Sequence, residues 1–234
     1  LYGSADQKQA VLEGLQEIGC VHLLDLCHGA DENAGDQYLL PNAADALKYL
    51  RACPAQRRAV REAPDFHVDE IVGQAMSIEQ KQRDLQTERD ELKQSISTLA
   101  PWGDFRLPKN GELHGLRLWL YVAPHHRLSE LAELSTPWHV VGRDHRFAYV
   151  AVVSADEPDD MPVSRAHLDD RSLSELEQRL EAVETELEEL YWQRVRLTRW
   201  SDQLSKRLGE ASDRAARARA AGLAFDDSSV FVVQ

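Results

Sequence analysis

The residues of this chain that could do chemistry are its histidines, nine in all. Four of them, His125, His126, His139 and His145, fall close together in the middle of the sequence. Adjacent histidines on a strand or at a helix start point in different directions, and neither an HExxH pattern nor a matching frame of acids accompanies these four. We therefore expect no metal site, no cofactor and no catalytic residue.

Motifs for nucleotide and acyl chemistry are absent from the sequence as well. It has no GxxxxGK[ST] phosphate loop, no GxGxxG after a strand and no GxSxG elbow. The sequence thus contains no recognisable motif for nucleophilic catalysis or phosphoryl transfer, and the chain is expected not to be an enzyme.

Cysteine usage and hydropathy indicate the compartment. The three cysteines, Cys20, Cys27 and Cys53, form no CxxC pattern and their number is odd, which favours a reducing cytoplasm over a disulfide framework. No stretch approaches the ~20 apolar residues that span a bilayer, and Leu1–Ser4 is no signal peptide. We expect a chain that is soluble by itself. Its apolar last residues, 230–233, favour a piece of a larger, membrane-bound protein.

Charge argues against a nucleic-acid partner. The formal net charge is −13 at pH 7, and the best local basic cluster is Arg214, Arg217 and Arg219. Neutralising phosphates requires an extended basic face, so neither nucleic acid nor anionic lipid is an expected general partner.

Two stretches carry an apolar heptad stripe, and the elements of the fold must be built around them. In the second stretch, positions stepping alternately by 3 and 4 are apolar at twelve of fourteen places: Leu173, Leu176, Leu180, Val183, Leu187, Leu190, Arg194, Leu197, Ser201, Leu204, Leu208, Ala211, Ala215 and Ala218. In the first stretch seven of nine are apolar: Ile71, Ala75, Ile78, Gln82, Leu85, Arg89, Leu92, Ile96 and Leu99.

Each stripe requires a partner, and the simplest partner for one is the other, with the chain returning antiparallel. The predicted fold class is α+β: a long antiparallel two-helix coiled-coil hairpin with a small α/β lobe at each end. The hairpin comprises 65–100 plus 170–221, one lobe comprises 1–64 plus 222–234, and the other comprises 101–169. The alternative is a self-dimerising coiled-coil scaffold, in which each stripe pairs with its copy in a second chain. The hairpin predicts a monomer, and light scattering over a concentration series distinguishes the two.

The first lobe is predicted to be built from both ends of the chain. Its expected elements are a helix over 6–18 with Ser4 as cap and Gly19 as stop, a strand over 20–26, a loop over 27–37, and a helix over 42–62 interrupted or kinked at Pro54. The last part of the return helix is expected to pack on the 42–62 helix, and a strand over 230–233 to join the sheet begun by 21–26.

The second lobe is predicted to be β-α-β-β, with strands over 116–122, 138–141 and 147–153 and a helix over 125–134. The outgoing helix is expected to start near Asp65. The return helix is expected to run unbroken over 172–221, capped by Asp169, Asp170 or Ser172.

The middle of the return helix interrupts the pattern. Arg194 and Ser201 are polar positions in the apolar stripe, facing a region expected to include 75–82. Such positions cost stability, so they are either a point where the hairpin flexes or a device that fixes register. Trp192 and Trp200 lie off the strict stripe and are assigned to the core, with a partner contact as the alternative.

Charge is also polarised along this helix. Residues 172–193 hold seven acids and one base, while 194–219 hold eight bases and three acids. Solvation and matching to the helix dipole account for this distribution, with a partner surface as the alternative.

Several stretches, in order along the chain, resemble the cytoplasmic N-terminal part of subunit I (subunit a) of V-type and A-type rotary ATPases. They are KQAVLEGL at 8–15, GCVHLLDL at 19–26, LAPWGDF at 99–105, the strand over 116–122 and VFVV at 230–233. No single stretch is specific, but together with the split heptads they favour this family. Two departures are notable: the family's usual first strand would precede Leu1, and the motif expected after Gln234 is absent.

The resemblance implies a non-catalytic stator at the cytoplasmic face of the membrane. One lobe would lie near the membrane and the other far from it, and both would hold peripheral stalks made of heterodimers of subunits E and G. The membrane half, which carries the arginine essential to proton or sodium movement, is not in this chain, so no transport residue can be assigned. Partner-binding residues are unknown, and candidate places are the strand over 138–141, the helix over 125–134 and the loop over 27–37.

Overall fold

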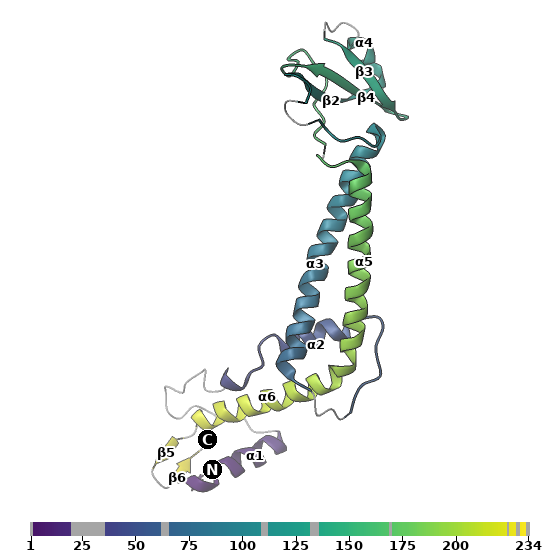
Figure 1. Cartoon of the computed structure of the whole chain (residues 1–234). Coiled ribbons are helices and arrows are strands. Elements are labelled where there is room, and N and C mark those ends of the chain that lie inside the picture. The colour runs from purple at the N-terminus through teal and green to yellow at the C-terminus, as the bar shows by residue number, and fades with distance from the viewer. Residues whose placement is uncertain are drawn as a thin grey trace. The chain divides into compact units, whose positions relative to one another are not determined.

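A computed structural model describes residues 2–19, 36–61, 66–108, 112–131, 136–168, 170–223, 225–227 and 230–232. The predicted strand over 20–26 and nearly all of the loop over 27–37 lie outside them. The chain divides into two compact units: unit 1 is Leu1–Gln80 with Tyr191–Gln234, and unit 2 is Lys81–Leu190. The elements of each unit are labelled in Figure 1, and the structure is α+β, as predicted.

Unit 1 contains a small antiparallel sheet made from both ends of the chain, although 21–26, the predicted partner of the last strand, lies outside the described residues. Its strands are β1 (Tyr2–Ser4), β5 (Phe225–Asp227) and β6 (Val230–Val232), in the order β1-β6-β5. Strand β1 pairs with β6 through Gly3 opposite Phe231. A Cβ on Gly3 would lie 2.7 Å from the Phe231 ring. The absence of a side chain at Gly3 therefore leaves room for the fully buried Phe231 ring.

Helix α1 (Lys8–Ile18) follows a 3-10 turn, Ala5–Gln7, and buries Leu12 against Phe231. Gly19 ends the helix as predicted, with φ +70° and its N–H donating to the Leu15 carbonyl at 3.2 Å. Ser4 occupies the N-cap position of the 3-10 turn, but its hydroxyl donates to the Asp6 carboxylate and caps no backbone N–H.

Helix α2 (Ala43–Arg51) is shorter than the predicted 42–62 helix, because it ends before Pro54 instead of kinking there. The Gln56 amide then donates to the carbonyls of Leu50 (3.1 Å), Arg51 (3.3 Å) and Cys53 (2.8 Å). The Leu50 and Arg51 carbonyls lie in the last turn of α2, where a helix leaves carbonyls without helical partners, and Cys53 follows the helix. The chain that follows has no helix up to Arg61.

The return helix is interrupted, which corrects the prediction of one unbroken helix. It consists of α5 (Leu173–Leu197) and α6 (Ser201–Leu223), separated by a 3-10 turn at Thr198–Trp200. The buried Thr198 hydroxyl donates to the Val195 carbonyl at 2.7 Å and accepts from the Arg57 N–H at 2.8 Å. The Val60 N–H donates to the Arg199 carbonyl at 3.1 Å, so the segment after α2 binds the chain where the helix breaks.

Helices α1 and α2 of unit 1 both contact α6. Helix α6 contacts α2, with Arg51 donating to Ser205 at 3.0 Å, as predicted for the last part of the return helix. Helix α3 (Val68–Leu99) begins in unit 1 and buries its stripe there at Ile71, Ala75 and Ile78.

Unit 2 confirms the predicted β-α-β-β order. Its elements after α3 are β2 (Arg117–Pro124), α4 (Leu128–Leu131), β3 (Trp138–Arg143) and β4 (Phe147–Ser154). All pairings are antiparallel in the order β2-β4-β3, with a bulge between Val140 and Gly142. Alternate residues face opposite sides: Tyr121 and Val150 pack against α4, while Leu120 and Tyr149 join the core of α3 and α5.

No helix in the parts of the chain that the structure describes has both the length and the apolar run needed to cross a bilayer.

Candidate functional site: the junction of the paired helices and the sheet of unit 2

In unit 2, α3 and α5 pack against each other through the predicted stripes. Leu92 and Leu99 of α3 share one core with Leu176 and Val183 of α5, all nearly or fully buried. The C-terminal end of α3 and the N-terminal end of α5 both reach the sheet, so the two helices run in opposite directions (Figure 1). Trp102, Leu120 and Tyr149 belong to the same core, which is therefore continuous from the helix pair into the sheet.

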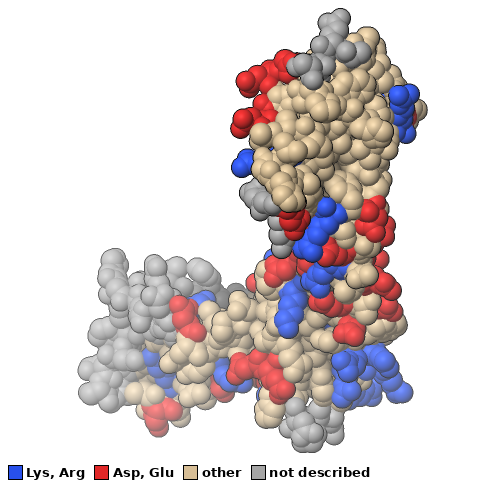
Figure 2. Space-filling view, turned by 45° about the horizontal axis from the view of Figure 1, so that its top comes forward, with Lys and Arg blue, Asp and Glu red and all other residues tan. Residues whose placement is uncertain are grey.

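Ion pairs join the two helices outside this core. Arg179 of α5 holds the Glu88 carboxylate of α3 with two bonds, 2.6 and 2.8 Å, and reaches Glu186 at 3.0 Å. Lys93 lies 3.0 Å from Glu184. Figure 2 shows acidic and basic side chains interspersed along the helices. The Arg179 hydrogen bond lowers the pKa of Glu88 and raises that of Arg179 itself. The pairs are partly exposed, so their main effect is to fix the alignment of the two helices.

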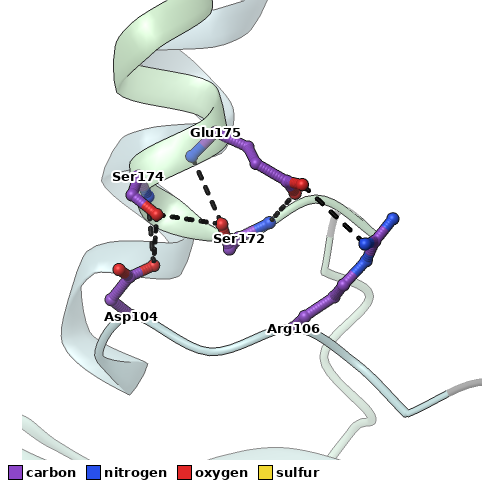
Figure 3. Close-up of polar contacts among 5 residues, drawn as sticks. All are labelled: Asp104, Arg106, Ser172, Ser174 and Glu175. Atoms are coloured by element: carbon purple, nitrogen blue, oxygen red, sulfur yellow. Dashed lines mark hydrogen bonds and ion pairs between the residues drawn. The ribbon is translucent and has the colours of Figure 1, made fainter.

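Helix α5 begins with a capping box at the junction, drawn in Figure 3. The Ser172 hydroxyl accepts from the Glu175 N–H at 3.2 Å, and the Glu175 carboxylate accepts from the Ser172 N–H at 2.8 Å. This reciprocal pattern satisfies two backbone donors that the helix start would leave without partners. Ser172 was one of three residues predicted to cap the helix, and the structure selects it.

The segment after α3 clasps this helix start. Asp104 accepts from the Ser174 N–H at 3.0 Å and from its hydroxyl at 3.3 Å, and Arg106 lies 3.8 Å from Glu175 (Figure 3). A carboxylate at a helix N-terminus is also favoured by the helix dipole. The segment that follows the C-terminal end of α3 is thereby bonded to the N-terminal end of α5.

Replacing Ser172 with alanine is expected to lower the free energy of unfolding by about 1 kcal/mol, because one helical N–H loses its acceptor. Urea unfolding followed by circular dichroism measures the change. Ser97→Ala is the matched control, since Ser97 is an exposed serine in the last turn of α3 and alanine is the better helix former. An equal loss in both variants would contradict a capping role for Ser172.

The β3–β4 hairpin is fixed to the same junction by an aspartate. Asp144 accepts from the N–H groups of Arg146 and Phe147 and from the Tyr149 hydroxyl, each at 2.7 Å. Tyr149 packs edge-on against Trp102 with ring centroids 5.2 Å apart. The bond from Tyr149, followed by the two N–H groups, lowers the pKa of Asp144 to about 2, and that same bond raises the pKa of Tyr149 to about 12.

This bonding predicts a pH dependence of stability. Because the pKa of Asp144 is lowered from 3.8 to about 2 on folding, its stabilising contribution is complete above about pH 4 and is lost as the pH falls toward 2. The difference in free energy of unfolding between the wild type and Asp144→Asn should therefore shrink over that interval. Urea titrations of both proteins at pH 2, 3, 4 and 6 measure it. A difference that is constant with pH would contradict this assignment.

Among the described residues, no group of three or more histidine, cysteine, aspartate or glutamate side chains is arranged to hold a metal ion. His125, His126, His139 and His145 are all exposed. His125 holds the hairpin turn: its ring nitrogen Nε2 lies 2.8 Å from the Asp144 carbonyl, and its N–H donates to the Arg146 carbonyl at 3.3 Å.

The two polar positions of the stripe lie beside the helix break in unit 1. Arg194 stacks on the Tyr49 ring at 3.9 Å and donates to the Tyr49 carbonyl, so the contacts found for it are with α2 and not with the expected region 75–82. Ser201 is buried, and neither its hydroxyl nor Arg194 Nε has a hydrogen-bond partner among the described residues.

The tryptophans of this region differ in exposure. Trp200 is half-buried, with its ring 5.6 Å from that of Phe66. Trp192 is 52% exposed and packs edge-on against Tyr191, so assigning it to the core is wrong.

The basic cluster near the end of α6 is largely neutralised within unit 1. Arg214 lies 3.7 Å from Glu210, Arg217 lies 2.8 Å from Glu13 of α1, and Arg219 lies 3.2 Å from Asp36. These pairs support the sequence argument against a phosphate-binding face.

Sequence reasoning missed Asp104 and Arg106 as junction residues. The only local signal is that they lie within three residues of Gly103, which has φ +89° and follows the 3-10 turn Ala100–Trp102. Their partners lie about seventy positions further along the sequence, and no sequence periodicity connects the two segments.

No protein-family model and no curated protein sequence matches this chain significantly. Among solved structures, the chain is similar to the cytoplasmic N-terminal domain of subunit I of V-ATPase, a homolog of subunit a. The identity is 16% and the TM-score 0.48, and the match covers 100% of this chain and 91% of that one. That domain comes from the protein that the sequence resembles.

Proposed function

We propose that this chain is a stator part of a V-type or A-type rotary ATPase, joining peripheral stalks to the ion-translocating membrane sector. It would resist rotor torque during proton or sodium transport and carry no catalytic residue of its own. The membrane-proximal lobe would comprise 1–64 plus 222–234, the coiled-coil hairpin 65–100 plus 170–221, and the distal lobe 101–169. The parent protein would be integral to the membrane, with this part at its cytoplasmic face.

The observation that carries the proposal is the continuous core of unit 2. Load applied to the sheet would pass into both helices at once, because Leu99 and Leu176 share their core with Leu120 and Tyr149. Close-packed cores transmit strain, and the Asp104 clasp would keep the helix ends together. The stretches over 99–105 and 230–233 contribute the resemblance to subunit I.

The pairing within one chain also weakens the scaffold alternative. In unit 2 the stripes of α3 and α5 cover each other, so neither requires a second copy. We expect a monomer at all concentrations in light scattering. An obligate dimer would favour the self-dimerising scaffold instead.

Reconstitution with stalk subunits tests the proposed function. The whole chain, mixed with an E–G heterodimer from the same source, should co-elute with it in gel filtration, while an equally acidic helical protein should not. We expect no binding of ATP or zinc in isothermal titration. Failure to bind the heterodimer, or tight binding of ATP, would contradict the proposal.

A further inference from the structure

One end of the sheet in unit 2 carries a charge opposite to that of the whole chain. The end of β2 meets the start of β4 where Pro124 pairs with Phe147, and the end of β3 meets it where Arg143 pairs with Ala148. The segment after β2 and the β3–β4 turn are therefore neighbours. Their basic and imidazole side chains are all exposed: His125, His126, Arg127, Arg143, His145 and Arg146. We call these six residues, with His139 on β3, the basic end.

The carboxylates near the basic end do not neutralise it as a whole. The oxygens of Asp144 accept hydrogen bonds from the Arg146 N–H, the Phe147 N–H and the Tyr149 hydroxyl, so this single carboxylate is bonded within the hairpin and offsets only one of the three arginine charges. Glu130 on α4 is exposed, and Glu133 lies outside the described residues. Arg127 donates to the Pro162 carbonyl at 2.7 Å, beside the acidic loop 156–160, so it marks the border of the basic end. Arg143 and Arg146 then form its centre.

The neighbouring edge of the sheet has an open groove that could bind a polypeptide segment. Strand β3 is an edge strand, and an open groove follows it, lined by Trp138, His139, Val140, Val141, Gly142 and Arg143. The bulge exposes Val141, which is 46% accessible. Bulges at sheet edges re-aim side chains, and an apolar side chain beside a rim of charge is typical of protein interfaces.

We propose that the basic end, with the β3 groove, binds a carboxylate-rich segment of a partner protein. Its arginines suit carboxylates because guanidinium groups bind them with two parallel bonds. Phosphate polymers and anionic membranes fit less well, since only three of the seven side chains are permanently charged and the net charge of −13 repels an extended anionic surface. The proposal stands on the charge and shape of unit 2 and does not require the stator role.

Fluorescence anisotropy with the whole chain tests this proposal. The probe is a short fluorescein-labelled peptide of glutamate and alanine, and its counterpart has glutamine in place of glutamate. We expect saturable binding of the glutamate peptide that weakens with added NaCl, and no binding of the glutamine peptide. Arg143→Glu with Arg146→Glu should weaken binding about tenfold, because two attractive charges become repulsive.

The matched control is Arg58→Glu with Arg61→Glu, which changes the net charge equally at two exposed arginines of unit 1. Its binding should equal that of the wild type. Circular dichroism confirms that both variants are folded. The proposal would be overturned if binding did not saturate or if the control variant weakened it equally. It would also be overturned if phosphatidylserine vesicles or single-stranded RNA bound more tightly than the peptide, or if the chain self-associated and the Arg143 and Arg146 changes abolished that self-association. Failure to bind an E–G heterodimer would contradict the stator role alone.

Discussion

Replacing Leu176 with alanine is expected to lower the free energy of unfolding by about 2–5 kcal/mol. Leu176 is fully buried in the core shared by α3, α5 and the sheet. The shorter side chain removes apolar contacts and leaves a cavity that the surrounding helices and sheet can fill only partly. Urea unfolding at constant temperature, followed by circular dichroism, measures the difference from the wild type.

Leu116→Ala is the control for this prediction. Leu116 is also in unit 2 but is 46% exposed, so its truncation should cost less than about 0.5 kcal/mol. If Leu176→Ala were no more destabilising than Leu116→Ala, the shared core would not be what holds the helix pair on the sheet.

Replacing Gly142 with alanine is expected to destabilise the chain by about 1–3 kcal/mol. A Cβ at this position would lie 2.5 Å from the Pro101 carbonyl oxygen, an approach that requires the backbone to move. Gly142 is on β3 and Pro101 is in the turn after α3, so the close contact brings the edge of the sheet onto the end of the helix. The midpoint of thermal unfolding should fall accordingly.

Gly73→Ala distinguishes a steric effect from the general effect of glycine replacement. Gly73 lies inside α3, and a Cβ there would meet nothing within 4 Å. This variant should be more stable than the wild type by about 0.5–1 kcal/mol, since alanine loses less conformational freedom in a helix. A Gly142→Ala protein as stable as the wild type would show that the sheet and the turn are not in tight contact.

The parts of the fold that follow from periodicity could be predicted. Stripes such as Leu92–Leu99 and Leu176–Val183 are long, and each leaves an apolar face that must be covered, so their pairing in unit 2 follows from the sequence. The capping box was also visible locally, as serine followed three residues later by glutamate at Glu175.

The features that could not be predicted depend on distant contacts. The break at Thr198 coincides with a bond from the Arg57 N–H, 141 residues away, and the early end of α2 with the Gln56 amide. Arg194 interrupts the apolar stripe between α3 and α5. Its guanidinium instead stacks on the Tyr49 ring, a contact between α5 and α2. Flexing at Arg194 and Ser201 remains a prediction, and the 3-10 turn at Thr198–Trp200 lies between these two positions.

The most direct test of the account is a zero-length carbodiimide crosslink between Lys93 and Glu184, whose charged atoms lie 3.0 Å apart on α3 and α5. The protein is mixed from unlabelled and nitrogen-15-labelled chains, crosslinked and analysed by mass spectrometry. We expect this crosslink in peptides of a single isotope only, because both helices belong to one chain. Mixed-isotope crosslinks, or none between these residues, would contradict it.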